Sequence, residues 1–351
     1  MPSTSQVVNV LRTVLFPGID RDIVTLGYVK DVTEADGRFQ IRVELSPTAG
    51  TARDGIEASI RTALENASIP YDLDLRAQRA AAPSPRAAGA EATDPLAQIP
   101  FKIAVSSGKG GVGKSTVAVN LAVAAAQLGH RVGLLDTDIY GPSVPLMMGL
   151  EDSQPMLDED RGKLIPLERY DVKNISIGYL VDRHTPVIWR GPMIGKAIDQ
   201  LMRDVDWSGV DVLFFDLPPG TGDIQISLAQ KVALSGAIVV STPQDVALID
   251  AAKGVEMFRK TEVPILGLLE NMSFFCCPSC GARSDIFGQG GGEREATRLG
   301  VPFLGQIPLE PAVRMGGDEG RPIVVRDPKS ASALAFFDVA RALLETLKAR
   351  T

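Results

Sequence analysis

The chain has 351 residues, of which 45% are hydrophobic and 23% are charged, and its formal net charge is −7. This composition is typical of a globular protein, and no uninterrupted apolar stretch reaches the roughly 18 residues that a membrane-spanning helix requires, so no membrane partner is expected. The acidic balance argues against a protein that holds nucleic acid over its whole surface by neutralising phosphates, so no nucleic-acid partner is expected either.

Residues 1–79 are predicted to form a small α+β domain. The chain begins without a basic segment followed by an apolar one, so we expect no secretory signal and assign the protein to the cytoplasm. The patterns follow in the order helix, two strands, helix, strand, over residues 7–15, 22–45, 55–67 and 71–77. The domain is near the size at which a single hydrophobic core suffices for folding.

A linker is predicted over residues 80–99, where alanine and proline are frequent and no apolar period is present. Residues 100–351 then alternate continuous apolar runs with helical patterns, which indicates an α/β domain with a mainly parallel sheet covered by helices on both faces. The expected strands are 101–107, 131–138, 210–218, 236–243, 264–273 and 303–309, and an amphipathic helix is expected over 332–350.

The most specific motif lies between the first of these strands and the following helix. It reads G-x-x-x-x-G-K-[ST], and this strand–loop–helix context is the one that a phosphate-binding P-loop requires. Its glycines let the backbone N–H groups face a phosphate, while Lys114 would reach the β- and γ-phosphates and the Ser115 hydroxyl would ligate Mg²⁺. The predicted nucleotide-binding residues are Gly108, Lys109, Gly110, Gly111, Val112, Gly113, Lys114, Ser115 and Thr116.

Aspartates stand at the ends of two of the predicted strands. Asp136 and Asp138 follow one apolar run, and Asp216 ends another. A carboxylate at the carboxyl end of a strand beside a P-loop can hold Mg²⁺ through water, which suits Asp216. A helix cap is the alternative role for Asp136 and Asp216.

The loop resembles the deviant Walker A signature K-G-G-x-G-K-[ST] of the P-loop ATPases that include MinD, ParA, the nitrogenase iron protein and the Mrp/NBP35 (ApbC-type) iron–sulfur cluster carriers. Residues 138–143, 189–193 and 271–280 resemble the carrier family in particular, and residues 22–29 resemble the MIP18-type (DUF59) domain that many carriers possess. The resemblance implies that ATP is the nucleotide and that Lys109 acts across a homodimer interface. It also implies that Asp138 is the switch I aspartate and that Asn271 recognises adenine.

The three cysteines, Cys276, Cys277 and Cys280, lie too close together for a disulfide framework and indicate metal or redox chemistry. In the carrier family the pair matching Cys277 and Cys280 ligates a [4Fe–4S] cluster. Such a cluster usually takes four thiolates, which two copies of the pair would supply at the two-fold axis of a homodimer. Zinc on the same four thiolates, a redox pair and structural thiols remain alternatives.

The small domain departs from the MIP18-type pattern, because residues 46–51 contain no cysteine and none occurs before Cys276. A cluster-handling role that depends on a thiol of this domain is therefore excluded. Target recognition and a purely structural role remain open for it.

The sequence therefore predicts a homodimeric, Mg²⁺-dependent ATPase that delivers an iron–sulfur cluster to apo-proteins. Lys109, Lys114, Asp138 and Asp216 are the predicted catalytic residues. The alternative is a spatial-organising ATPase similar to ParA or MinD, in which an ATP-bound dimer binds DNA or a membrane. The acidic balance and the C-x-x-C pair favour the carrier.

Overall fold

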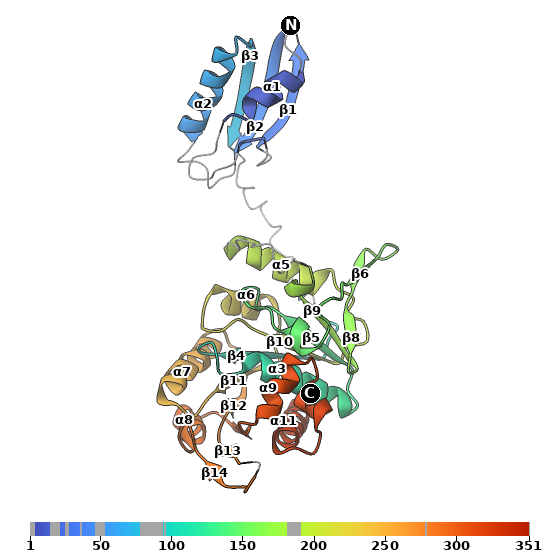
Figure 1. Ribbon diagram of the computed structural model, residues 1–351, viewed down its shortest axis with the longest axis vertical. Coiled ribbons are helices and arrows are strands. Elements are labelled where there is room, and N and C mark those ends of the chain that lie inside the picture. The colour runs from blue at the N-terminus through green and yellow to red at the C-terminus, as the bar shows by residue number, and fades with distance from the viewer. Residues whose placement is uncertain are drawn as a thin grey trace. The chain divides into compact units, whose positions relative to one another are not determined.

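The computed structural model describes residues 4–14, 22–24, 28–35, 37–45, 53–77, 94, 96–180, 191–277 and 279–350 (Figure 1). The chain forms two compact units, Met1–Glu91 and Ala92–Thr351. No helix in these described ranges is long and apolar enough to cross a membrane.

The small unit is a three-stranded sheet with helices packed on its apolar side chains. Its elements in chain order are α1 (Thr4–Leu11), β1 (Val29–Ala35), β2 (Arg38–Leu45), α2 (Arg53–Asn66) and β3 (Tyr71–Ala77). Strand β2 pairs antiparallel with β1 and parallel with β3, so the connection through α2 is the crossover that a parallel pair requires. The core is formed by alternate residues of β2, namely Phe39, Ile41 and Val43, with apolar residues of both helices. The predicted order of elements is therefore present in the described part of this unit.

The large unit is built on an eight-stranded sheet in the order β15-β12-β11-β4-β10-β5-β9-β8. The strands are β4 (Phe101–Ser107), β5 (Val132–Asp136), β8 (Leu167–Arg169), β9 (Val172–Ser176), β10 (Val212–Asp216), β11 (Gly236–Ser241), β12 (Ile265–Glu270) and β15 (Phe303–Gln306). All neighbouring pairs are parallel except β8 and β9. The predicted mainly parallel sheet is confirmed.

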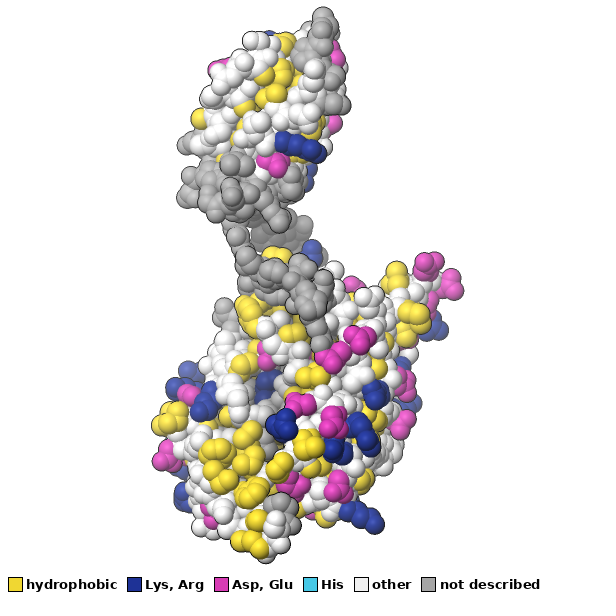
Figure 2. All heavy atoms as spheres, in the orientation of Figure 1, with side chains coloured by type: hydrophobic (Ala, Val, Ile, Leu, Met, Phe, Trp, Pro, Cys, Tyr) yellow, Lys and Arg dark blue, Asp and Glu magenta, His cyan; other side chains and the backbone are white. Residues whose placement is uncertain are grey.

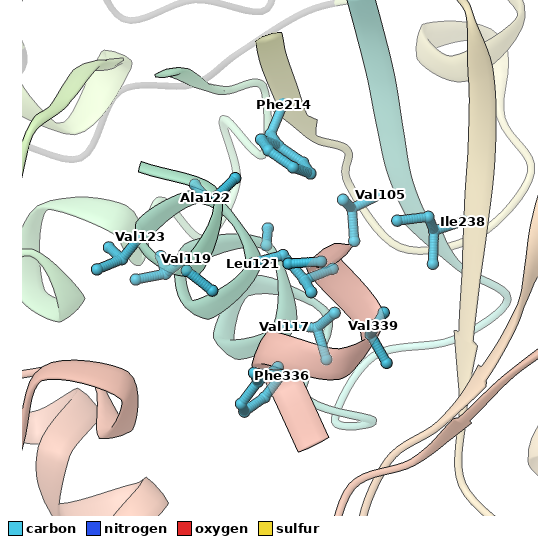
Figure 3. Packing of buried hydrophobic residues seen from close by; sticks show 14 of the residues in the cluster. Val105, Val117, Val119, Leu121, Ala122, Val123, Phe214, Ile238, Phe336 and Val339 are labelled. Atoms are coloured by element: carbon cyan, nitrogen blue, oxygen red, sulfur yellow. The ribbon is translucent and has the colours of Figure 1, made fainter. Parts of the chain in front are cut away.

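Helices cover both faces of this sheet. The principal ones are α3 (Lys114–Gln127), α5 (Gly191–Arg203), α6 (Asp223–Lys231), α7 (Asp245–Lys260), α8 (Gly291–Leu299) and α11 (Ala331–Lys348). Side chains of a strand point alternately to the two faces, so Val105 joins one buried cluster while the neighbouring Ala104 joins the other. Figure 3 shows Val105 and Phe214 of the sheet in one cluster with Leu121 of α3 and Phe336 of α11.

Shorter elements complete the large unit. They are α4 (Val144–Met147), a 3₁₀ turn (Ile177–Tyr179), α9 (Pro311–Asp318), α10 (Ile323–Arg326), and the hairpins of β6 (Met156–Asp158) with β7 (Lys163–Ile165) and of β13 (Phe275–Cys276) with β14 (Arg283–Ser284). The β13–β14 hairpin carries the cysteines, and it leaves the sheet shortly after the end of β12.

The end of the segment interpreted as a linker packs on the large unit. Leu96 and Ile99 are buried in the same cluster as Ala104. The Lys102 ammonium forms an ion pair with Asp94 at 3.0 Å and donates to the carbonyl oxygens of Leu96 and Ile99. Ordered packing therefore begins before the predicted domain start at residue 100. The rest of the predicted linker, residues 80–93 and 95, lies outside the described residues.

Candidate nucleotide and cysteine site

The P-loop lies between the carboxyl end of β4 and the first residue of α3. Gly111 and Gly113 both have φ of 81°, a left-handed conformation that side chains disfavour. A Cβ on Gly108 would lie 2.1 Å from the carbonyl carbon of Asp250 in α7, so this position tolerates only glycine. The Ser107 hydroxyl donates to the carbonyl oxygen of Lys109 at 2.9 Å, which helps to fix the entry of the loop. These contacts and glycine conformations fix the shape of the loop.

Lys114 begins α3 and is surrounded by acidic groups. Its ammonium donates to Asp216 Oδ1 at 2.5 Å and to Ser115 Oγ at 3.0 Å, and it lies 3.6 Å from Asp138 Oδ2. Lys114 and Asp216 are both buried. The structure therefore brings together the lysine, serine and aspartates that the motifs predicted, and the carboxylates balance the buried cation.

Asp136 and Asp216 lie side by side because β5 and β10 pair in register at these residues. Asp136 is completely buried, accepts from the backbone N–H of Asp138 at 3.0 Å, and accepts from the hydroxyl of Ser176 in β9 at 2.8 Å. Burial, together with the nearby Asp216 carboxylate, raises the pKa of Asp136 to about 8. The raised pKa favours the protonated form of Asp136 and so limits the negative charge in the site.

The pKa of Asp138 is also raised, mainly because the carboxyl group is partly buried, although Lys114 opposes the shift. Asp216 Oδ2 is buried and has no hydrogen-bond partner among the described residues. The Asp216 carboxylate and the Ser115 hydroxyl both contact the Lys114 ammonium, and they are hard oxygen ligands of the kind that Mg²⁺ prefers. The donor set therefore fits this ion.

Asn271 reaches the P-loop from the end of β12. Its side-chain amide donates to the carbonyl oxygen of Val112 at 2.9 Å, and a Cβ on Gly113 would lie 2.3 Å from the same nitrogen. The structure thus places Asn271 against the nucleotide loop across 159 positions of sequence. Lys109 is half-buried, and its ammonium has no partner among the residues that the structure describes.

The C-x-x-C pair lies in the turn of the β13–β14 hairpin. The backbone N–H of Cys277 donates to Ala282 O at 2.9 Å, and the N–H of Gly281 donates to Cys277 O at 2.8 Å. Cys280 is exposed and Cys277 is half-buried. Hydrogen bonds from the backbone of Ser279 and of Cys280 lower the pKa of the Cys277 thiol, which favours the thiolate that a metal binds.

The described residues of a single chain do not supply all the ligands of a cluster or zinc site. No group of three or more His, Cys, Asp or Glu side chains in the described ranges could bind a metal ion. The hairpin supplies the Cys277 and Cys280 thiols, so a site with four thiolates requires a second source of ligands.

Family comparisons agree with this geometry. Residues 98–344 match the NUBPL iron-transfer P-loop NTPase family, and residues 4–70 match the iron-sulfur cluster assembly protein family. The chain belongs to the NUBPL iron-transfer family. The resemblance inferred from the motifs is thereby confirmed for both parts of the chain.

Two bacterial relatives of this NUBPL-family chain match it over nearly its whole length, and a plant relative matches 70% of it. An iron-sulfur cluster carrier protein of Helicobacter pylori is 40% identical and covers 99% of this chain and 95% of its own. One of Deinococcus radiodurans is 44% identical and covers 97% and 95%. An iron-sulfur protein of Arabidopsis thaliana, required for mitochondrial NADH dehydrogenase, is 53% identical over 70% of this chain and 78% of its own.

Solved structures share the fold of the large unit. A nucleotide-binding protein of Archaeoglobus fulgidus in complex with ADP has a TM-score of 0.60 and 36% identity, and the match covers 70% of this chain and 97% of that one. The cell division ATPase MinD of Pyrococcus furiosus has a TM-score of 0.54 and 24% identity, with 71% and 100% covered. The second match shows the fold alone.

Two buried residues of this NUBPL-family site were missed by the sequence analysis. Ser176 contacts Asp136 only because β9 lies beside β5, and nothing local in the sequence indicates that pairing. Glu270 ends β12 directly before Asn271, and its acidic side chain at the end of an apolar strand was the available signal. The family-like residues Trp189 and Arg190 lie outside the described residues.

Proposed function

We propose that this member of the iron-transfer family binds and hydrolyses ATP, binds a [4Fe–4S] cluster as cargo at a homodimer interface, and transfers it to apo-proteins. The observation that carries the proposal is the exposed C-x-x-C hairpin, which begins within a few residues of the strand end that contacts the P-loop. Asn271, which contacts the P-loop, and the two cysteines therefore lie on one short stretch of chain. The names of the full-length relatives support the same function.

The charges around Lys114 indicate how ATP and Mg²⁺ would bind. Its ammonium is balanced by Asp216 and Asp138, and a triphosphate would compete for it. Ser115 and Asp216 would hold Mg²⁺, which supplies charge neutralisation of the β- and γ-phosphates. As Lys114 turns to the phosphates, Asp138 is released to position the attacking water and Asn271 contacts the adenine.

The homodimer is supported by two observations besides the number of cysteines. The Lys109 ammonium has no partner among the described residues, as expected of a cation that acts on the nucleotide of a second chain. Val246 and Ile249, at the start of α7 beside Gly108, are 65% and 60% exposed. Figure 2 shows hydrophobic side chains gathered on the lower part of the large unit. Burial of such side chains would stabilise a dimer.

The cluster would be held by Cys277 and Cys280 of both chains. The lowered pKa of Cys277 favours the thiolate before any iron is present. Cys276 pairs with Arg283 in the hairpin ladder and is not assigned a ligand role. Zinc on the same four thiolates is the competing cargo, because it accepts the same tetrahedral ligand set.

The test is anaerobic reconstitution with iron and sulfide, followed by analysis of iron, sulfide and zinc and by light scattering. We expect about four iron atoms and four sulfides per dimer for the wild type. The double variant Cys277→Ala and Cys280→Ala should bind none, whereas Cys276→Ala is the matched control and should bind the wild-type amount. Equal iron in the double variant and the wild type would refute the ligand assignment, and zinc without iron would refute the cargo.

A further inference from the structure

A short segment connects Asn271, which contacts the P-loop, to the cysteine hairpin. Asn271 is held on the carbonyl oxygen of Val112, and the Met272 methyl lies 3.5 Å from where a Cβ on Gly113 would stand. Phe274 follows, with the Arg283 guanidinium 4.0 Å from its ring centroid. Strand β13 then begins at Phe275. Because few residues separate Asn271 from Cys277, a displacement of Asn271 also displaces the cysteines unless the segment between them bends.

The segment is held in a conformation that it would not adopt alone. Met272 has φ of 55°, in the left-handed region that a residue with a side chain disfavours. Such a conformation persists only where the residues on both sides are fixed. The backbone N–H of Ser273 donates to Ile307 O at 3.0 Å, which fixes one side of Met272.

Glu270 supplies the other fixed point. It is fully buried, and its Oε1 accepts from the Ser273 hydroxyl at 2.5 Å and from the Gln306 amide at 3.1 Å. Its Oε2 accepts from the backbone N–H of Gly292 at 2.6 Å, in the first turn of α8, where the helix favours a negative charge. A Cβ on Gly292 would lie 2.8 Å from the same oxygen, so glycine is needed for this close approach. One carboxylate therefore connects β12, β15, α8 and the residue after Met272.

We infer that Glu270 is a positioning residue that couples the nucleotide loop to the cysteine hairpin. It touches neither the P-loop nor the cysteines, and no step of ATP hydrolysis requires it. Its hydrogen bonds hold the Asn271–Phe274 segment rigid, so that a nucleotide displacing Asn271 also displaces Cys277 and Cys280. The inference rests on the proposed function, since it explains how nucleotide binding changes the affinity of the cysteines for the iron–sulfur cluster.

The test uses thiol reactivity, which does not require a bound cluster. Alkylation rates of Cys277 and Cys280 are measured by peptide mass spectrometry in the full-length apo-protein, with and without Mg-ATP. We expect ATP to change the rates by about 5-fold or more in the wild type, the lower end of usual coupling between sites. In Glu270→Gln, which keeps the size but replaces the charged acceptor, the change should fall below about 2-fold while ATP affinity stays within about 2-fold.

Asp94→Asn is the control, because Asp94 is also a carboxylate that accepts from backbone N–H groups, those of Leu96 and Ala233, at the other end of β4, where it also pairs with Lys102. It should keep the wild-type response. Light scattering measures whether both variants dimerise as the wild type does. Equal dimerisation shows that a difference in thiol reactivity does not come from burial of the thiols in the dimer interface. If Glu270→Gln does not fold, Ser273→Ala removes one of the same hydrogen bonds and should reduce the response in part.

The outcomes separate this inference from the proposed function. If wild type binds a cluster but Glu270→Gln keeps the full ATP response, the positioning role is wrong and the carrier function stands. The same holds if ATP leaves thiol reactivity unchanged in the wild type. If ATP changes thiol reactivity through Glu270 but no cluster is bound, the carrier function is wrong and the coupling stands.

Discussion

Replacing Asp136 by asparagine should stabilise the large unit, and the gain should depend on pH. Asp136 is buried beside Asp216, and this environment raises its pKa to about 8. In the unfolded chain the same group ionises near pH 3.9. Between these two values the folded protein must keep a proton that the unfolded chain releases, so the stability falls as the pH rises. Asparagine keeps the shape and never carries the charge.

The size of the effect follows from the pKa shift. Each unit between the two pKa values corresponds to about 1.4 kcal/mol, so from pH 4 to pH 7 the folded state loses up to about 4 kcal/mol relative to a neutral residue. Both hydrogen bonds of Asp136 can be kept, because Asn accepts from the Asp138 N–H and donates to Ser176. The charges of Lys114 and Asp216 also act on Asp136, and Lys114 reduces the cost of ionising it. We therefore expect Asp136→Asn to raise the free energy of unfolding by about 2 to 4 kcal/mol at pH 7.

The assay is urea unfolding from pH 4 to pH 8 followed by tryptophan fluorescence. Both tryptophans, Trp189 and Trp207, lie in residues 100–351, and Trp207 is buried, so the signal reports the large unit. The difference in unfolding free energy between Asp136→Asn and wild type should be near zero at pH 4 and grow with pH. A difference independent of pH, or a variant less stable at pH 7 than at pH 4 relative to wild type, would contradict the protonated state of Asp136.

Three further predictions concern the loop and the hairpin. Gly108→Ala should lower the melting temperature and abolish ATP binding, because its Cβ would lie 2.1 Å from the backbone of Asp250 and overpacking costs about 1–3 kcal/mol. Gly110→Ala is the control: no atom lies within 4 Å of its Cβ position, so it should keep the wild-type melting temperature. Lys109→Ala should bind ATP but hydrolyse it at least about 10-fold more slowly, and normal hydrolysis would exclude a trans-acting role. Alkylation of Cys277 should have its midpoint at a lower pH in the folded protein than in the urea-unfolded chain, since backbone hydrogen bonds lower its pKa; an equal or higher midpoint in the folded protein would contradict the hairpin geometry.

The amino-acid sequence by itself determined the features that depend on local order. The P-loop is one continuous motif between a strand and a helix, and the C-x-x-C pair lies within a single turn, so both could be recognised without knowing what lies beside them. The closing strand of the small unit was predicted at the observed residues, Tyr71–Ala77, because β-rich runs bounded by turns are also local signals. The roles assigned to the site residues remain predictions for the experiments above.

Only the tertiary structure decided which distant groups meet. The raised pKa of Asp136 depends on the register of β5 and β10, and register is set by packing of whole strands rather than by residues near position 136. In the same way, Leu96 and Ile99 look like linker in a segment without apolar period, yet they are buried because the large unit offers them a site. The contacts of Glu270 join three elements that are separate in sequence, β12, α8 and β15. Local periodicity predicts elements, whereas long-range pairing places the charges that the chemistry uses.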